Sequence, residues 1–317
     1  MSPAAYSMIA DLFPKDRLGK ALGFYSVGVF LGIGIAYILG GQIVTLIAEA
    51  GGVTWPLVGT LQGWQVTFIV VGAPGLLVGL LVLTLTEPKR RHTGQKAAFS
   101  LSEAADFIWR RSKVYLPHFV GFSMLTLLFN GILAWAPEFY IRSYAVDRQY
   151  AGTAIGLIVI VFGSLGIYAG GVASDYLTRR GHDDGPIRAG LIGAACLTPF
   201  AVAAPLMPSA NLATLLFCFV LFFASFPFGP AAAAIQIVTP GPLRAQVSAV
   251  YLFVVNLTGI GLGATVTALV TDYVFADDSM LRYAMTIVAA ISGSLAILIL
   301  WSAMAPFRNA AVAGRLP

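Results

Sequence analysis

The stretch YAGTAIGLIVIVFGSLGIYAGGVASDYLTRR, residues 150–180, decides how the rest of the sequence is interpreted. Its first part, residues 150–173, contains no charged side chain and is long enough to cross a bilayer core of about 30 Å as a helix. It is followed by Asp175, Arg179 and Arg180. An apolar run that stops at basic residues is typical of a membrane-spanning helix that ends on the cytoplasmic side.

The composition of the whole chain also indicates a membrane protein. Of its 317 residues 58% are hydrophobic and 10% are charged, and the mean hydropathy is +0.84. A soluble domain is typically about one quarter charged, so these values exclude a soluble enzyme, a disordered chain and a coiled coil. An outer-membrane barrel is excluded because its strands alternate apolar and polar residues. The 3 histidines lack metal-ligand spacing, Cys196 and Cys218 lie in apolar runs, and we predict no metal or cofactor.

Working outward from residues 150–173, we find eight stretches long enough to span a bilayer. They are roughly 19–48, 64–86, 114–139, 150–173, 187–206, 211–238, 245–271 and 281–305. A stub, Met1 to Leu12, precedes them and is too short to span. Backbone polar groups must be paired inside a lipid bilayer, so each span should be helical. The predicted fold class is therefore all-α, a polytopic membrane helical bundle.

The Lys and Arg residues predict the orientation of this bundle. Sixteen of the 19 lie in one set of loops, namely 11–20, 87–113, 174–188, 239–245 and the tail after 305. The opposite loops hold only Arg142, Arg148 and Arg282. We expect a multi-pass protein of the inner or plasma membrane with both ends in the cytoplasm. The net charge of +5 is then a topology signal, and we predict no nucleic-acid partner.

The chain contains an internal repeat. A shift of 227 residues gives eight identities in 32 ungapped positions, including Arg17 with Arg244 and Gly32-Ile33-Gly34 with Gly259-Ile260-Gly261. The second copy follows about three and a half spans, whereas nothing in this chain precedes the first. We infer two equivalent six-helix halves, of which the chain lacks the first three to four helices.

This inference divides the chain into four parts. Residues 1–86 carry the end of helix 4 and helices 5 and 6, and 87–113 form a cytoplasmic linker with a short surface helix at 101–111. Residues 114–305 carry helices 7–12, and 306–317 form a cytoplasmic tail. Parallel repeats of this kind are found in major facilitator transporters.

The residues themselves resemble the major facilitator superfamily. Gly171, Asp175, Arg179 and Arg180 match its G-x-x-x-D-x-x-x-R-R loop signature between helices 8 and 9, although Thr178 stands where the family usually has Gly. In that family the Asp favours a neighbouring helix N-terminus and the arginines latch the inner gate. We assign Arg17 and Arg244 to the same gate. The alternative is that Arg179 and Arg180 are only positive-inside anchors and that Asp175 is only a polar residue at the end of a helix.

A finer resemblance is to the spinster-like branch. The segments that show this resemblance are Ser2–Pro14, Gly32–Tyr37, Gln236–Pro240 and Asn256–Gly263, and the resemblance extends from Ser2 to about Phe307. Characterised animal relatives export lysolipids and sphingoid-base phosphates, but the resemblance does not imply a substrate for this chain. The predicted spans hold no ionisable residue near mid-depth. The resemblance places a coupling carboxylate on helices 1 and 4, so proton coupling would use residues absent from this chain.

Two helices carry small and polar residues along one face. One stripe is Ser123, Thr126, Asn130, Ala134 and Pro137, and the other is Asn256, Gly259, Gly263 and Thr267. A buried amide in a membrane needs a partner, so Asn130 and Asn256 either line a wet cavity or hold helices together. With Phe226 they are our candidates for a substrate cavity. Glycines 152, 156, 163 and 170 share another face and predict close helix packing.

The function that these observations favour is secondary transport of a small organic or amphipathic, lipid-like solute by alternating access. The alternative is an inactive truncated fragment or an incomplete gene model, which translation of the DNA upstream of Met1 would distinguish. A membrane enzyme is disfavoured because the spans contain no paired aspartates, no serine with a base and no histidine cluster. The expected partners are the bilayer and the solute.

Overall fold

The computed structural model describes Ile9, residues 12–14, 17–49, 53–55, 59–82, Thr84 and 100–313. Most of the expected stub, residues 83, 85 and 86 of the expected second span and residues 87–99 of the expected linker lie outside this part, as do 314–317. Pro3, Ala4 and Ala5, which the shift of 227 residues aligns with the identical residues Pro230, Ala231 and Ala232, lie outside it as well.

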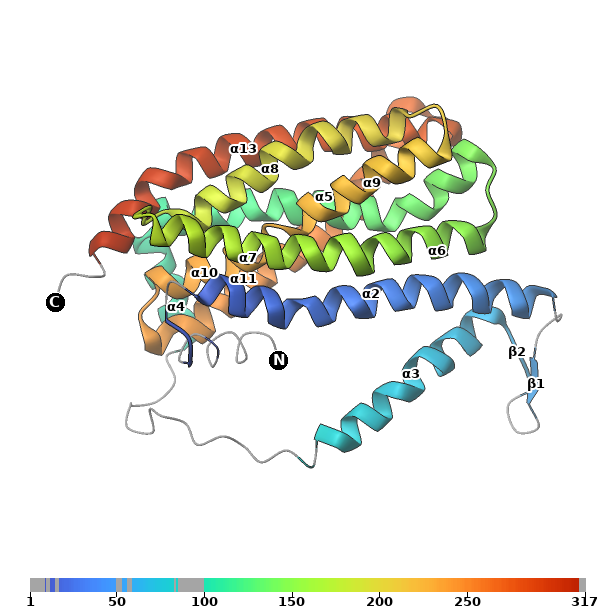
Figure 1. Cartoon of the computed structure of the whole chain (residues 1–317), viewed down its shortest axis with the longest axis horizontal. Helices are drawn as coiled ribbons and strands as arrows, with labels where there is room; N and C mark the ends of the chain where they lie inside the picture. Colours follow the sequence, from blue (N-terminus) through green and yellow to red (C-terminus); the bar gives the residue numbers. More distant parts are fainter. Residues whose placement is uncertain are drawn as a thin grey trace.

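The described residues form a helical bundle with one short hairpin (Figure 1). Before the linker lie α2 (Leu18–Glu49), β1 (Val53–Trp55), β2 (Gly59–Leu61) and α3 (Gly63–Val82). After it follow α4 (Leu101–Arg110), α5 (Ser112–Tyr144), α6 (Arg148–Ile158), η1 (Val159–Gly163), α7 (Ser164–Arg179), α8 (Gly185–Ala203), η2 (Ala204–Leu206) and α9 (Ala210–Ser225). The chain ends with α10 (Phe228–Val238), η3 (Gly241–Leu243), α11 (Arg244–Asn256), η4 (Leu257–Leu262), α12 (Gly263–Leu269), η5 (Val270–Phe275), η6 (Asp278–Met280) and α13 (Leu281–Ala313).

The helices are long because their sequences are continuously apolar. Within the described residues, 7 helices are long and apolar enough to cross a membrane. The remaining predicted span, 64–86, corresponds to α3, a helix of 20 residues that begins at Gly63. The multi-pass, all-helical architecture predicted from the sequence is therefore confirmed, apart from the antiparallel hairpin of β1 and β2.

Several spans are composite helices. One runs through α6, η1 and α7, and another through α11, η4, α12 and η5, where η1, η4 and η5 are wide π-helical turns. Such turns inside α-helices often mark functional positions. The span 211–238 is interrupted near Pro227, which lacks a backbone N–H and separates α9 from α10.

The last helix is longer than expected. The sequence predicts a cytoplasmic tail from residue 306, but α13 continues to Ala313 with Pro306 inside it. Residues 306–313 are therefore helical, because a proline bends a membrane helix without having to end it when neighbouring helices support the backbone. Their location in the cytoplasm stays a prediction.

The core lies among α5, α8 and α13, which pack along one another. Gly121 on α5 and Gly190 on α8 are covered by the side chains of Leu300 and Phe122 respectively. In Figure 1 the start of α2, the α7–α8 junction, the α10–α11 junction and the end of α13 gather at one end of the bundle. This end carries the basic loops, and we call it the basic end. Its assignment to the cytoplasm stays a prediction.

Candidate functional site

Where α2 meets α6, main-chain atoms of the two helices come into close contact. A Cβ added at Gly156 would lie 2.6 Å from the carbonyl oxygen of Gly34. One added at Gly152 would lie 2.8 Å from the carbonyl oxygen of Tyr37 and 3.4 Å from the Cα of Gly41. Only glycine permits helix backbones to approach so closely. We call this contact of α2 with α6, η1 and α7 the seam.

The predicted glycine stripe contributes three residues to the seam. Gly163, at the end of η1, faces the ring of Phe30 on α2 and continues the row of Gly152 and Gly156. Gly170 differs, because a Cβ there would meet the backbone of Phe226 instead. The stripe therefore packs the composite helix against two neighbours, with α6 and η1 against α2 and α7 against the α9–α10 corner.

Asp175 joins α7 to the start of α2 at the basic end. Its side chain is 4% exposed, and one carboxylate oxygen accepts a hydrogen bond of 2.8 Å from the backbone N–H of Lys20. Lys20 lies in the first turn of α2, where backbone N–H groups have no partner within their own helix. A carboxylate at this position also interacts favourably with the helix dipole. Gly171, one turn earlier on α7, is buried.

The four arginines assigned to the gate surround this contact in different ways. Three are exposed, namely Arg17, Arg179 and Arg180. Arg244 is half-buried, and its Nε donates to the carbonyl oxygen of Thr239 at 3.2 Å. The structure thus brings Asp175 onto α2 and leaves the arginines around the basic end. Their action as an inner-gate latch stays a prediction.

The two polar stripes meet across the contact of α5 with η4 and α12. A Cβ at Gly259 would lie 3.1 Å from Nδ2 of Asn130, and one at Gly263 would lie 3.0 Å from the Cβ of Asn130. The Asn130 amide, which is half-buried, donates to the carbonyl oxygen of Thr126 at 2.9 Å. Asn256 lies one turn before Gly259, and its side chain is exposed. The structure therefore brings Asn130 to the facing stripe and leaves Asn256 free of it.

Phe226 lies inside the bundle. Its ring is 7% exposed and packs against Gly193 on α8, where an added Cβ would lie 3.2 Å from the ring. Since the ring faces packed helices, we do not include Phe226 in the site proposed below.

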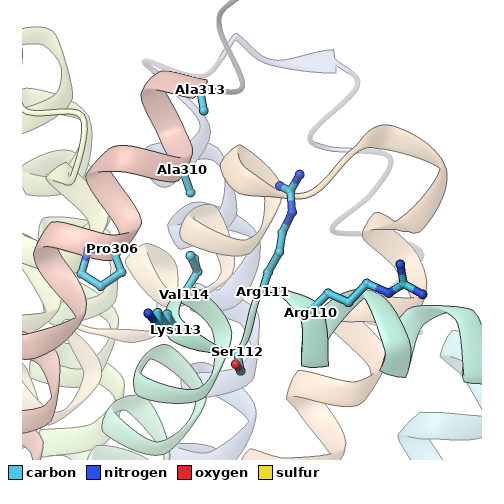
Figure 2. Close-up of a pocket in the computed structure, with 8 residues that line it drawn as sticks. All are labelled: Arg110, Arg111, Ser112, Lys113, Val114, Pro306, Ala310 and Ala313. Atoms are coloured by element: carbon cyan, nitrogen blue, oxygen red, sulfur yellow. The ribbon is translucent and has the colours of Figure 1, made fainter.

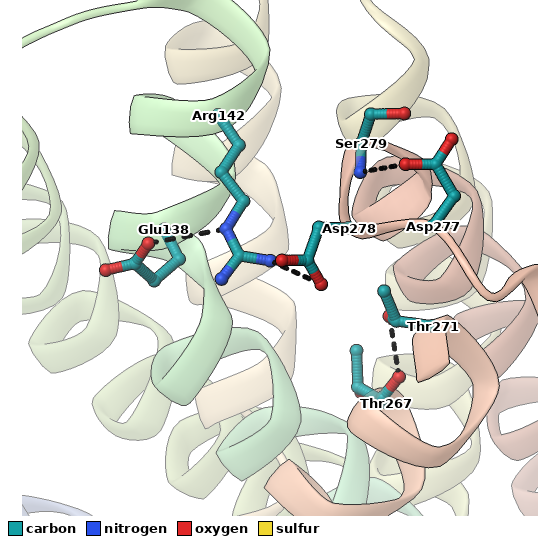
Figure 3. Close-up of polar contacts among 7 residues, drawn as sticks. All are labelled: Glu138, Arg142, Thr267, Thr271, Asp277, Asp278 and Ser279. Carbon is teal, nitrogen blue, oxygen red and sulfur yellow. Dashed lines mark hydrogen bonds and ion pairs between the residues drawn. The ribbon is translucent and has the colours of Figure 1, made fainter. Parts of the chain in front are cut away.

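An ionic network closes the opposite end of α5 (Figure 3). Arg142 lies 3.5 Å from Glu138 and 3.6 Å from Asp278, and Arg148 lies 3.8 Å from Glu138. These contacts tie α5 to the start of α6 and to the turn before α13. Beside them, Thr271 donates to the carbonyl oxygen of Thr267 at 2.9 Å, at the end of the second polar stripe (Figure 3).

Sequence reasoning missed the residues of α2 that complete the site. The backbone N–H of Lys20 is one, and the hydroxyl of Tyr37, which donates to the carbonyl oxygen of Leu133 at 2.6 Å, is another. Both contacts join segments far apart in the chain, so no local spacing signals them. Within the described part, no group of three His, Cys, Asp or Glu side chains is arranged to hold a metal ion.

Comparison with known proteins identifies the family of the chain. The chain matches the model of the Major Facilitator Superfamily over residues 1–264. It therefore belongs to the Major Facilitator Superfamily, and its relatives place it on the spinster-like branch. Protein spinster homolog 1 of Rattus norvegicus is 29% identical over 213 residues, which cover 61% of this chain and 38% of that protein. The hexuronate transporter of Bacillus subtilis is 24% identical over 189 residues, covering 57% of this chain and 40% of that one.

A solved structure has the same fold. A bacterial homologue of the human lysosomal transporter spinster, in an inward-facing and unoccupied conformation, has a TM-score of 0.59 and 23% identity. The match covers 97% of this chain and 74% of that chain. By contrast, the chain matches less than half the length of the rat and Bacillus proteins. The relatives are transporters and not enzymes, in agreement with the sequence analysis.

Proposed function

We propose that the chain works in secondary transport, carrying a small organic or amphipathic solute by alternating access. The observation that supports this most is the seam. At its closest points, such as Gly34 against Gly156, small residues let α2 lie directly on the backbone of α6, with the side chains of Ile38 and Ile160 packed beside the contact. Alternating access needs such a contact, because two bodies rock about a site near the middle of the membrane.

The exposed face around Asn256 supports a mostly apolar solute with a polar head. Its neighbours Phe253 and Ile260 are both 67% exposed, which provides a broad apolar surface beside one amide. The sequence contains no Lys or Arg from 245 to 281 or from 114 to 141. A small anion such as a hexuronate would find no cation along these helices, and burying an unpaired charge is costly. We therefore favour a lipid-like solute.

The rocking motion can be measured with pairs of spin labels. In a background without the two native cysteines, one pair replaces Phe24 on α2 and Tyr176 on α7 near the basic end. The other pair replaces Leu46 on α2 and Tyr150 on α6 at the opposite end. The four side chains are 72%, 49%, 63% and 42% exposed respectively, so the labels should not disturb packing.

Alternating access predicts two distance populations for each pair, with the long distance at one end occurring together with the short distance at the other. A lysophospholipid should shift the ratio of the two populations, and glucuronate should not. One fixed population that no solute shifts would support the alternative of an inactive fragment. A shift by glucuronate alone would assign the site to sugar acids and contradict the lipid-like solute.

A further inference from the structure

A cavity of about 470 Å³ opens at the basic end, where α4, α5 and α13 meet (Figure 2). Its lining combines the polar side chains of Arg110, Arg111, Ser112 and Lys113 with the apolar side chains of Val114, Pro306, Ala310 and Ala313. Figure 2 shows Lys113 beside Val114 and Pro306. The volume is in the range of pockets that hold small ligands. A cavity with cations next to apolar side chains fits a ligand that combines an anionic group with hydrocarbon.

Among the described residues, only one of the three cations of this cavity has an acidic partner. Arg110 pairs with Asp106 at 2.7 Å, although both side chains are mostly exposed. The Arg111 guanidinium lies 4.9 Å from the centre of the Phe107 ring. Among the described residues, neither Arg111 nor Lys113 has a carboxylate within 4.0 Å. Figure 2 shows Arg110 and Arg111 extending from the corner in different directions, so the proposal below uses Arg111 and not Arg110.

The helix α4 places this cavity at the surface of the membrane. It is amphipathic, with Ala104 and Ile108 buried against the bundle and Trp109 74% exposed. Its start is fixed by a capping box, in which Ser100 and Glu103 bond each other's backbone N–H. Tryptophan side chains concentrate at the headgroup level of bilayers. Trp301 on α13, which is 68% exposed, lies just before the part of that helix that lines the cavity.

We propose that this corner binds the phosphate of an anionic membrane lipid in the leaflet at the basic end. Arg111 and Lys113 hold the phosphate, and Val114, Pro306 and Ala310 contact the glycerol and the first methylene groups. Arginine suits this task because its planar guanidinium donates two parallel hydrogen bonds to one phosphate. Basic pockets between membrane helices bind anionic headgroups for the same reason. The proposal rests on the membrane fold alone and is independent of transport.

Quenching of tryptophan fluorescence by brominated lipids tests the proposal on the whole chain in detergent micelles. The titrants are brominated phosphatidylglycerol and brominated phosphatidylcholine at low salt. The wild-type chain should bind phosphatidylglycerol saturably and at least tenfold more tightly than phosphatidylcholine, and replacing both Trp109 and Trp301 by Phe should remove most of the saturable quenching. Since each basic residue near a membrane surface contributes about a fivefold preference for anionic lipid, Lys113→Gln should weaken binding about fivefold and Arg111→Gln with Lys113→Gln about 30-fold.

Arg308→Gln is the matched control, because Arg308 is exposed on α13 at the same end but does not line the cavity. It should change affinity by less than threefold. An equal loss in Arg308→Gln would overturn the site in favour of diffuse charge attraction. Equal quenching by phosphatidylcholine would exclude recognition of the anionic headgroup. Displacement of the lipid by inorganic phosphate at a similar concentration would assign the corner to free anions and overturn the lipid proposal. Unchanged thermal midpoints without lipid confirm that the variants fold.

Discussion

Replacing Gly34 by alanine should loosen the seam. Gly34 is buried, and its new Cβ would lie 2.6 Å from the carbonyl oxygen of Gly156 and would also meet the side chain of Ile160. Ordinary contact at such a Cβ begins at 3.4 Å, so α2 and α6 would have to separate there by up to about 0.8 Å. Overpacking of this kind costs about 1–3 kcal/mol, which changes the population of the closed seam by roughly 5- to 150-fold.

Gly32→Ala is the matched control for this prediction. Gly32 lies on the same helix, is exposed and has no atom within 4 Å of an added Cβ. Both substitutions add a methyl group and gain the same helix propensity of about 1 kcal/mol, so the difference between the two variants isolates the steric cost at the seam.

Reversible titration with SDS gives the free energy of unfolding of both variants in detergent. Hydrogen exchange of residues 30–40 then reports whether α2 itself separates from the bundle. We expect Gly34→Ala to be less stable than Gly32→Ala by about 1–3 kcal/mol and to exchange faster. Equal stability and equal exchange would refute the close contact of α2 with α6.

Three further changes test the rest of the site. Asp175→Ala should speed hydrogen exchange at the Lys20 amide and destabilise the start of α2 by about 1 kcal/mol, as loss of a helix cap does. In a transport-competent chain this substitution should slow the transport cycle more than it weakens solute binding. A collapse of solute affinity with an unchanged cycling rate would contradict the latch. In a background without native cysteines, Asn256→Cys should react with a water-soluble thiol reagent faster than Asn130→Cys, and protection by solute at position 256 would support the cavity, whereas no reaction at 256 would remove it from the site. Arg142→Gln should lower the free energy of unfolding by less than about 1 kcal/mol, since its ion pairs are partly exposed and screened; a loss of several kcal/mol would show that the network is a main support of the fold.

The sequence predicts the helices well because the cost of unpaired backbone in lipid leaves few alternatives. An uncharged run such as residues 150–173 must be helical, and the structure has a continuous span there from Arg148 to Arg179. The end of α13 was predicted less well, because Pro306 reads locally as a boundary, and the neighbouring helices that carry α13 past it are not visible in the local sequence.

The site was predicted in part. Asp175 was placed at a helix N-terminus through the family resemblance, but its partner Lys20 lies 155 residues away in the chain, and only tertiary packing brings the two together. Asn130 gave two readings because an amide at mid-span can face water or a helix, and the choice depends on Gly259 across the contact. Phe226 is buried because Gly193 makes room for its ring, and no periodicity in its own helix shows this.

The internal repeat likewise predicts which residues are small but not which of them contact a neighbouring helix. The aligned glycines Gly34 and Gly261 do not have the same surroundings, because Gly34 meets the backbone of Gly156 whereas Gly261 has one atom at the edge of contact. In the second copy it is Gly259 that touches the neighbouring helix, next to Thr126 and Asn130. Identity between repeats therefore preserved small residues but not which of them makes the contact.

Part of the seam is a contact between main-chain atoms, and there the two helices have no interlocking side chains. Where glycine meets glycine, as at Gly152 and Gly41, no protruding side chain distinguishes one offset of the helices from the next. The position of α2 along α6 and α7 is then fixed by two hydrogen bonds outside the glycine row. One joins the Asp175 carboxylate to the Lys20 amide, and the other joins the hydroxyl of Tyr37 on α2 to the carbonyl oxygen of Leu133 on α5. A single substitution at either of these two hydrogen bonds could therefore change how far α2 slides, while the glycine contacts stay the same.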